Sequence, residues 1–172
     1  MNEDTFPVTD YTVRSLGVYW IFDGRWEVFD NFYEAPVRVD VGWGAQEYQT
    51  SEHAFAAAKA TTQADHNSVQ YCVTPGAAKA VGRMLPLRPD WDQVKFDIMW
   101  RVLCAKYEQV ALLRQDLIVT RGRVIVEGNT WDDRVWGATP VSKGAGSGPF
   151  NVGAKLRGRN ALGRMLMMLR DQ

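Results

Sequence analysis

A glutamate and a lysine seven positions apart are the first candidates for chemistry in this sequence. Glu52 and Lys59 lie in an alanine-rich segment that is expected to form a helix after Thr50 or Ser51. Seven residues at 100° each return to the same helix face, about 10 Å further along the axis. Both side chains can therefore point into one pocket without forming a direct ion pair. The alternative is an amphipathic helix with two solvated charges, which spacing alone favours.

A lysine amine can act as a nucleophile only after it has lost its proton. At the ordinary pKa of about 10.4, roughly one amine in a thousand is neutral at pH 7, a cost of about 4–5 kcal/mol. Burial against Phe55 and other aromatic residues would lower the pKa of Lys59. A carboxylate as near as Glu52 would oppose that shift, so the separation of the two groups matters to the chemistry.

A second group of polar and aromatic residues lies at 129–137, after a short apolar segment that is expected to be a strand. It contains two acidic residues, an arginine and two tryptophans, and loops that follow regular elements often carry catalytic side chains. The alternative is a turn in which one aspartate caps backbone amides and the tryptophans fill the core. The residues alone favour neither of these two interpretations.

Other patterns indicate no specific chemistry. Residues 143–148 are rich in glycine but lack the Gly-Lys-Ser/Thr ending and the following helix of a phosphate loop. Cys72 and Cys104 have neither metal nor redox spacing, so reduced thiols are expected, although a single disulfide is possible. The chain has only two histidines, so a zinc site would need carboxylates, and we expect neither a metal nor another cofactor.

The chain that positions these residues has 172 of them, which suits one domain over residues 1–172 with a core at about 16–170. Hydrophobic residues make up 46% of the chain, enough for a sizeable core, and they exclude general disorder. The formal net charge of zero argues against a protein that coats nucleic acid or anionic lipid. We expect a cytoplasmic protein that does not bind membranes, because no membrane span or secretory signal is visible.

The charge is uneven along the chain. Residues 1–40 contain eight acidic and three basic residues, whereas residues 140–172 contain six basic residues and one acidic residue. Either the two ends pack beside each other, which position alone favours, or the basic end binds a ligand that carries phosphate.

Periodicity and capping signals predict a helix-dominated α+β fold with a small N-terminal sheet and one later short strand. Strands are expected at 18–22, 37–41 and 124–126. Helices are expected at 52–60, at 75–82 after an N-cap at Thr74, at 96–105, at 112–118 and in the tail from Asn160. Asp90 and Gln93 form a capping-box pattern before the third helix, which is apolar almost all round and belongs in the middle of the fold.

Several segments keep one order along residues 22–170. They are Asp30-Asn-Phe-Tyr33, the stretch from Tyr48 to Lys59, Trp91 to Lys95, Lys106-Tyr-Glu-Gln109, Asp133-Arg-Val-Trp-Gly137 and the stretch from Asn160 to Arg170. Together they resemble the NADAR family, the YbiA-like N-glycosidases. Asp30 stands where the family has Ser, Ala56 stands where Gln is usual, and the glycine-rich residues 142–153 resemble an insertion that bears on substrate choice.

The resemblance implies hydrolysis of an N-glycosidic bond between a ribose carbon and a nitrogen base. The known substrate classes are phosphoribosylamino-pyrimidine intermediates and ADP-ribose attached to guanine. Glu52, Lys59, Trp91 and Asp133 fall on the positions associated with activity. In the family's proposed mechanism the lysine attacks the anomeric carbon and passes through a Schiff base.

We therefore expect a metal-independent N-glycosidase for a ribose-phosphate or ADP-ribose conjugate, with ADP-ribosylated nucleic acid as a possible substrate. Lys59 would be the nucleophile, Glu52 the proton shuttle, and Asp133 would hold ribose hydroxyls or support positive charge at C1′. The expected substrate contacts are Asn31 near the sugar, Trp91 and Trp136 against the base, Arg159 and Arg170 at phosphate unless Arg170 is structural, and Phe32, Tyr48, Phe55, Gly137 and Asn160.

Two alternatives come from other functional classes. A non-catalytic ADP-ribose or nucleotide-binding module would need neither Glu52 nor Lys59, so the presence of both counts against it. A structural or interaction protein that keeps the fold as a scaffold would tolerate alanine at the aromatic residues of the pocket. The zero net charge leaves self-association open.

Overall fold

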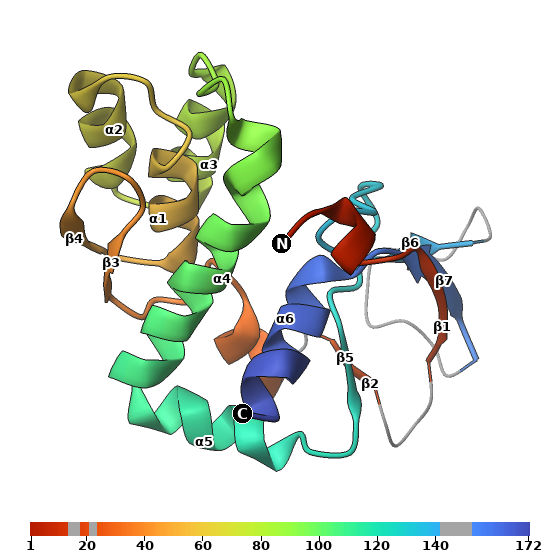
Figure 1. The fold of residues 1–172 in the computed structure, drawn as a ribbon. Helices are drawn as coiled ribbons and strands as arrows, with labels where there is room; N and C mark the ends of the chain where they lie inside the picture. Colours follow the sequence, from red (N-terminus) through yellow and green to blue (C-terminus); the bar gives the residue numbers. More distant parts are fainter. Residues whose placement is uncertain (14–17, 21–23, 142–152) are drawn as a thin grey trace. The chain divides into compact units, whose positions relative to one another are not determined.

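The computed structural model describes residues 1–13, 18–20, 24–141 and 153–172 (Figure 1). Within these residues lie six α-helices and seven short strands, which confirms the predicted helix-dominated α+β class. Contacts divide the chain into two compact units. The first comprises residues 1–2 and 31–111, and the second comprises the described residues of 3–30 and 112–172. The single domain over 1–172 stays a prediction, and most of the predicted glycine-rich insertion lies outside the described residues.

The first unit packs four helices with a β-hairpin. The hairpin pairs β3 (Val37–Asp40) antiparallel with β4 (Ala45–Tyr48). The helices are α1 (Ser51–Ala57), α2 (Gln63–Gln70), α3 (Pro75–Met84) and α4 (Trp91–Gln109). Helix α1 lies at the centre, because it contacts the other three helices and every one of its residues is buried. Its side chains are therefore held by packing on all sides.

Threonines begin three of these helices. Thr50, Thr62 and Thr74 are extended, and each side chain accepts a hydrogen bond from a backbone N–H in the first turn of α1, α2 or α3. The predicted N-caps at Thr50 and Thr74 are thus confirmed. Helix α2 was not predicted, because it has few apolar residues and so no hydrophobic periodicity.

Helix α1 ends at Ala57, earlier than the predicted residue 60. Beyond it the N–H of Lys59 donates to the carbonyl of Ala56 at 3.2 Å, and the N–H of Ala60 donates to that of Ala57 at 3.1 Å. These bonds span three residues instead of four, so the chain tightens into a turn. Lys59 consequently lies in the turn that follows α1.

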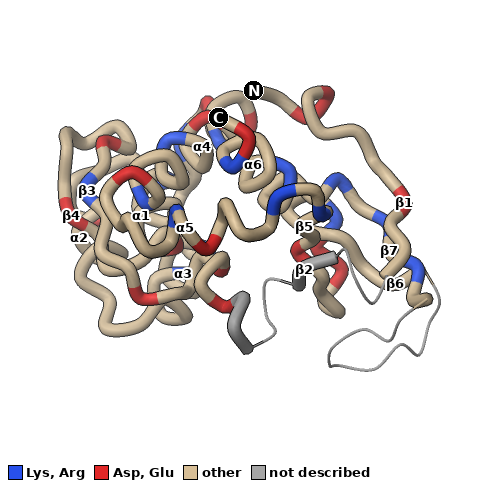
Figure 2. The backbone as a smooth tube through the Cα atoms, turned by 90° about the horizontal axis from the view of Figure 1, so that it is seen from below, with Lys and Arg blue, Asp and Glu red and all other residues tan. Residues whose placement is uncertain are grey.

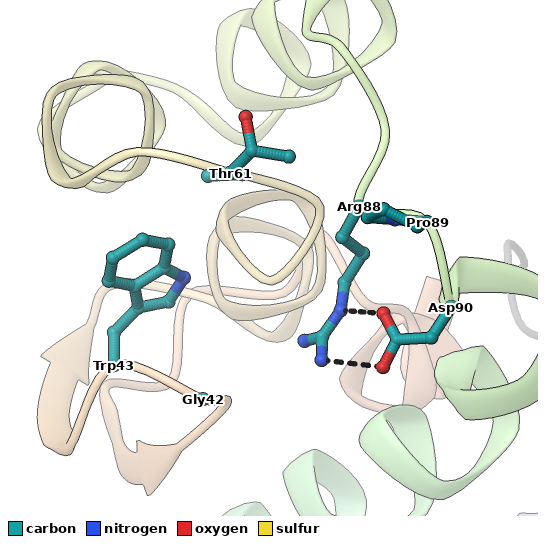
Figure 3. Close-up of a pocket in the computed structure, with 7 residues that line it drawn as sticks. Gly42, Trp43, Thr61, Arg88, Pro89 and Asp90 are labelled. Atoms are coloured by element: carbon teal, nitrogen blue, oxygen red, sulfur yellow. Dashed lines mark hydrogen bonds and ion pairs between the residues drawn. The ribbon is translucent and has the colours of Figure 1, made fainter.

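The capping box predicted at the start of α4 is wrong. Asp90 occupies the N-cap position but makes no side-chain cap hydrogen bond. Its carboxylate instead accepts two hydrogen bonds from the Arg88 guanidinium, at 2.6 and 2.9 Å (Figure 3). The charged, bidentate partner is the stronger one, so it displaces the backbone amide. The helix itself is confirmed, with Phe96 and Leu103 fully buried.

The second unit joins two small sheets to the C-terminal helix. One sheet has the order β1 (Thr9–Thr12), β7 (Lys155–Gly158) and β6 (Thr139–Pro140), all antiparallel. In the other, β2 (Val18–Trp20) pairs in parallel with β5 (Val124–Val126), which contacts α6 (Ala161–Arg170). Helix α5 (Ala111–Val119) leads into β5, and short 3-10 helices η1 and η2 span Glu3–Thr5 and Gly24–Phe29. The late strands β6 and β7 add to the one that was predicted.

The acidic N-terminus and the basic C-terminus pack together inside this second unit (Figure 2). In the register of β1 and β7, Asp10 lies opposite Arg157, with Oδ1 and Nε 3.8 Å apart. Arg159 forms a second ion pair with Glu3 at 2.9 Å. The interpretation that position favoured is therefore confirmed, and two cations of the basic tail pair with the acidic end.

Candidate active site

The Lys59 amine lies against two aromatic rings. Its Nζ is 5.5 Å from the centroid of the Phe55 ring and 5.6 Å from that of Trp91. The two rings pack together with their centroids 5.0 Å apart. Phe55 comes from α1 and Trp91 is the first residue of α4, so the contact between these helices builds the wall. Three of the predicted site residues are thereby brought together.

Burial lowers the pKa of the Lys59 amine, and this is the largest influence on it. Glu52 raises the pKa, whereas the cations Arg83 and Lys79 lower it further. The balance is downward, so a larger fraction of the amine is neutral at pH 7 than in water. The Glu52 carboxylate acts on the charge of the amine, but more weakly than burial does. This is the arrangement in which a lysine can attack an electrophilic carbon.

Asn31 is tied to the first turn of α1, where Glu52 is only 6% exposed. The carbonyl of Asn31 accepts a hydrogen bond from the Glu52 N–H at 3.0 Å, and its Nδ2 donates to the Met99 sulfur at 3.7 Å. The Oδ1 atom of Asn31 is buried and accepts no hydrogen bond within the described part of the chain. Such an oxygen costs about 1–3 kcal/mol, so it is suited to a hydroxyl that donates to it.

Phe32 and Tyr48, two further predicted contacts, have different surroundings. Phe32 is 37% exposed, and the amine of Lys79 lies 5.1 Å above its ring. Tyr48 is almost fully buried, and its hydroxyl lies 2.9 Å from Nε2 of His66 on α2. Burial raises the pKa of Tyr48, and the charge of Asp40 adds to that rise. The contacts of Tyr48 hold α2 against β4, and its role in substrate binding stays a prediction.

In the second unit Asp133 caps a tight turn. Its Oδ1 accepts hydrogen bonds from the N–H groups of Val135 and Trp136, at 3.1 and 3.0 Å. The side-chain amide of Asn129 holds the backbone of Asp133. It donates to the Asp133 carbonyl at 2.7 Å and accepts from the Asp133 N–H at 3.0 Å. The capping interpretation is confirmed for Asp133, but Trp131 is 56% exposed and does not fill the core. The turn fixes the carboxylate in one orientation, and its catalytic role stays a prediction.

Gly137 and Asn160 are held by backbone groups of the same unit. A Cβ atom at Gly137 would lie 2.2 Å from the carbonyl oxygen of Glu127, so only glycine fits there. Asn160 has a φ of 50°, accepts from the Glu127 N–H at 2.9 Å and donates to the Ile125 carbonyl at 2.8 Å. These contacts give both residues a structural role, and their predicted substrate contacts are untested.

The two arginines predicted to contact phosphate also bind backbone carbonyls. Arg159 donates to the carbonyls of Glu3 and Phe6, at 2.9 and 3.0 Å. Arg170 is 7% exposed and donates to the Thr120 and Arg123 carbonyls, at 3.0 and 2.7 Å. Arg170 is thus a structural pairing residue, which was one of the two alternatives. The phosphate contact of Arg159 stays a prediction.

Sequence reasoning missed Lys79 and Arg83. They lie four positions apart on α3, so they share a face of that helix, and both act on the charge state of Lys59. The signal that could have found them is a helix with two cations in this spacing and no acidic residue of its own.

A cavity of about 290 Å³ lies beside the turn that holds Lys59 (Figure 3). Its lining consists of Gly42, Trp43, Ala60, Thr61, Arg88, Pro89 and Asp90. The N–H of Arg88 donates to the Lys59 carbonyl at 3.1 Å, and the Arg88 carbonyl accepts from the Trp91 N–H at 3.0 Å. Arg88 therefore links the backbone of the turn that holds Lys59 to the backbone of Trp91, the first residue of α4.

Within the described ranges, no group of three His, Cys, Asp or Glu side chains is placed to hold a metal ion. None of the helices described there is both long and apolar enough to cross a bilayer. Cys72 and Cys104 are free thiols, as expected.

Comparisons with known proteins agree on one family. The model of the NADAR domain matches residues 19–172. The chain is 35% identical over 146 residues to N-glycosidase YbiA of Escherichia coli (strain K12), covering 84% of this chain and 79% of that protein. It is 30% identical over 147 residues to N-glycosidase Npun_R5314 of Nostoc punctiforme, covering 84% and 83%. Its fold is similar to the NMR structure of the E. coli protein YbiA, with a TM-score of 0.70 and 32% identity over 94% of this chain and 87% of that one.

Proposed function

The chain belongs to the NADAR family and is an N-glycosidase, and on this premise we propose that it cleaves ribose phosphate or ADP-ribose from a nitrogen base. The proposed substrates are ADP-ribosylated guanine in nucleic acid and a phosphoribosylamino-pyrimidine. The observation that carries the proposal is the Lys59 amine, which lies against Phe55 and Trp91 with a lowered pKa and a buried carboxylate, Glu52, within electrostatic reach.

The first step makes the nucleophile and expels the base. Glu52 takes a proton from the Lys59 ammonium, which leaves a neutral amine and a carboxylic acid. The amine nitrogen then bonds to C1′ while the bond between C1′ and the base nitrogen breaks. The electron pair of that bond goes to the base nitrogen, which receives the proton held by Glu52. The free base leaves, and the sugar stays bound to Lys59.

The second step returns the enzyme to its starting state. The Lys59 nitrogen loses a proton to the ring oxygen, the bond between C1′ and that oxygen opens, and a protonated Schiff base forms. Water adds to C1′, and one of its protons passes to the lysine nitrogen through Glu52. The bond between carbon and lysine nitrogen then breaks while C1′ becomes a carbonyl, and the remaining hydroxyl proton passes through Glu52 to the released amine. The products are the free base, the sugar and the regenerated Lys59 ammonium.

Other residues position the substrate in this proposal. A ribose hydroxyl donates to the buried Oδ1 of Asn31, which relieves the cost of that unpaired oxygen. Trp91, which lies against the Lys59 amine, walls the base or stacks on it. The roles expected of Asp133 and Trp136, in the second unit, stay predictions.

A base-release assay with matched lysine variants tests this function. The panel contains ADP-ribosylated guanine DNA and phosphoribosylamino-pyrimidines, and the released base is quantified by chromatography. Lys59→Ala and Lys59→Arg should both abolish release, because neither side chain can form a Schiff base. The exposed Lys155 serves as the control, and Lys155→Ala should retain full activity. Substantial release by Lys59→Arg, or tight binding without release by the wild type, would contradict the proposal.

A further inference from the structure

Lys79 and Arg83 form a group of three cations with the proposed nucleophile, Lys59. Lys79 and Arg83 on α3 both act electrostatically on the Lys59 amine, while Glu52 is the one carboxylate with an effect on it among the described residues. Like charges held together repel one another, so a cluster with this excess of positive charge is suited to binding an anion.

The packing of α3 on α1 fixes where these cations lie. Gly82 faces Ala56 so closely that a Cβ atom at Gly82 would lie 2.9 Å from the Ala56 Cβ. Ala56 lies on α1 between Glu52 and Lys59. Lys79 precedes the contact and Arg83 follows it directly, so the closest approach of the two helices brings both cations to the reactive end of α1.

Both cations remain available for a ligand. Within the described part of the chain, neither Lys79 nor Arg83 forms an ion pair. Arg83 is exposed, and the amine of partly buried Lys79 lies 5.1 Å above the ring of Phe32. Arg159, by contrast, already donates to two carbonyls and the Glu3 carboxylate.

We propose that Lys79 and Arg83 bind the phosphate of the substrate, with the Phe32 ring beneath the Lys79 amine. The inference rests on the proposed function, which it deepens by assigning the phosphate site to α3 rather than to the basic tail. Arg83 supplies a planar guanidinium that can donate two hydrogen bonds to phosphate oxygens, and Lys79 supplies a point charge. Phosphate on the sugar thus anchors C1′ near Lys59.

Binding of ribose 5-phosphate tests the phosphate site without requiring catalysis. The wild type, Lys79→Gln, Arg83→Gln and the control Lys155→Gln are titrated with ribose 5-phosphate and with ribose, and binding is followed by calorimetry. The wild type should bind ribose 5-phosphate more tightly than ribose. Each α3 variant should lose at least about tenfold in affinity for the phosphate form, the order expected for a lost charge-assisted hydrogen bond, while Lys155→Gln should not.

The outcomes separate this inference from the proposed function. Loss of ribose 5-phosphate binding in the α3 variants supports the phosphate site even if no base is released from any substrate. Unchanged binding in folded Lys79→Gln and Arg83→Gln, or a wild type that does not distinguish ribose 5-phosphate from ribose, overturns the site even if the glycosidase is active. Arg159→Gln, measured alongside, would show the largest loss if the basic tail held the phosphate.

Discussion

At the scale of single residues, the chemistry depends on a competition over one proton. Burial against Phe55 and Trp91 pushes the pKa of Lys59 down, and Glu52 pushes it back up. Burial is the larger influence, so the amine can lose its proton although a carboxylate favours its charged form.

Two single substitutions should move the pKa of Lys59 in opposite directions. Glu52→Gln removes the charge that raises the pKa, so it should fall, whereas Arg83→Gln removes a charge that lowers it, so it should rise. The measurement is the rate at which a lysine-specific acylating reagent labels Lys59 as a function of pH. Shifts in the same direction, or none, would contradict the electrostatic description. Glu52→Gln should also slow base release by about 10²–10⁴-fold, the usual contribution of a proton-transferring side chain.

At the scale of elements, the site depends on how α1 meets α3 and α4. The sequence predicted α1, α3, α4 and α6 because alanine runs, threonine caps and apolar stretches are strong local signals. It did not predict β1, β6 and β7, which have two to four residues each and exist because distant segments pair. The end of α1 was misplaced because the chain tightens into a turn before Ala60, and the alanine-rich sequence carries no local signal for that turn.

The site residues that could be predicted are those close together in the sequence, whereas those brought near by helix packing could not. Glu52, Phe55 and Lys59 are close in sequence, so their grouping could be inferred from spacing, and the resemblance to a family added Trp91. Lys79 was missed because its effect on Lys59 comes from helix packing, which no local pattern encodes.

Gly82 provides the test at this scale. Gly82→Ala should push α3 away from Ala56, lower the free energy of unfolding by about 1–3 kcal/mol and weaken ribose 5-phosphate binding. Gly76→Ala is the matched control on the same helix, because the nearest atom to its added Cβ would be 4.0 Å away, at Thr74. It should be neutral or stabilise by less than about 1 kcal/mol. Chemical denaturation of both variants gives the comparison, and equal stability would show that the contact is not tight.

At the scale of the whole molecule, opposite charges at the chain ends are matched inside one unit, while positive charge remains in excess around Lys59. Arg157 and Arg159 form ion pairs with Asp10 and Glu3, so these two cations of the basic tail have a structural role. A net charge of zero therefore conceals a local excess that serves binding. The sequence alone could show the asymmetry of the ends but not which cations stay available.

The partly buried Lys59 amine should also reduce the stability of the folded chain at neutral pH. Below its folded-state pKa, Lys59 is charged in both states, so the folded chain carries the full cost of burying the charge. This cost is relieved as pH rises from the folded pKa through the unfolded value near 10.5, because the proton is lost. Lys59→Met should therefore raise Tm by a few degrees at pH 7, and the gain should shrink at pH 10. Calorimetry with exposed Lys155→Met as a control checks this; a gain independent of pH would contradict it.

Trapping the covalent intermediate on Lys59 is the most direct test of the proposed Schiff-base mechanism. Borohydride is added during turnover of the substrate with the fastest base release, and the protein is digested and mapped by mass spectrometry. We predict a reduced sugar adduct on Lys59 that is absent without substrate and absent in Lys59→Arg. An active enzyme that yields no adduct, or an adduct only on another lysine, would contradict the Schiff base and favour an acid–base route through Glu52 and Asp133.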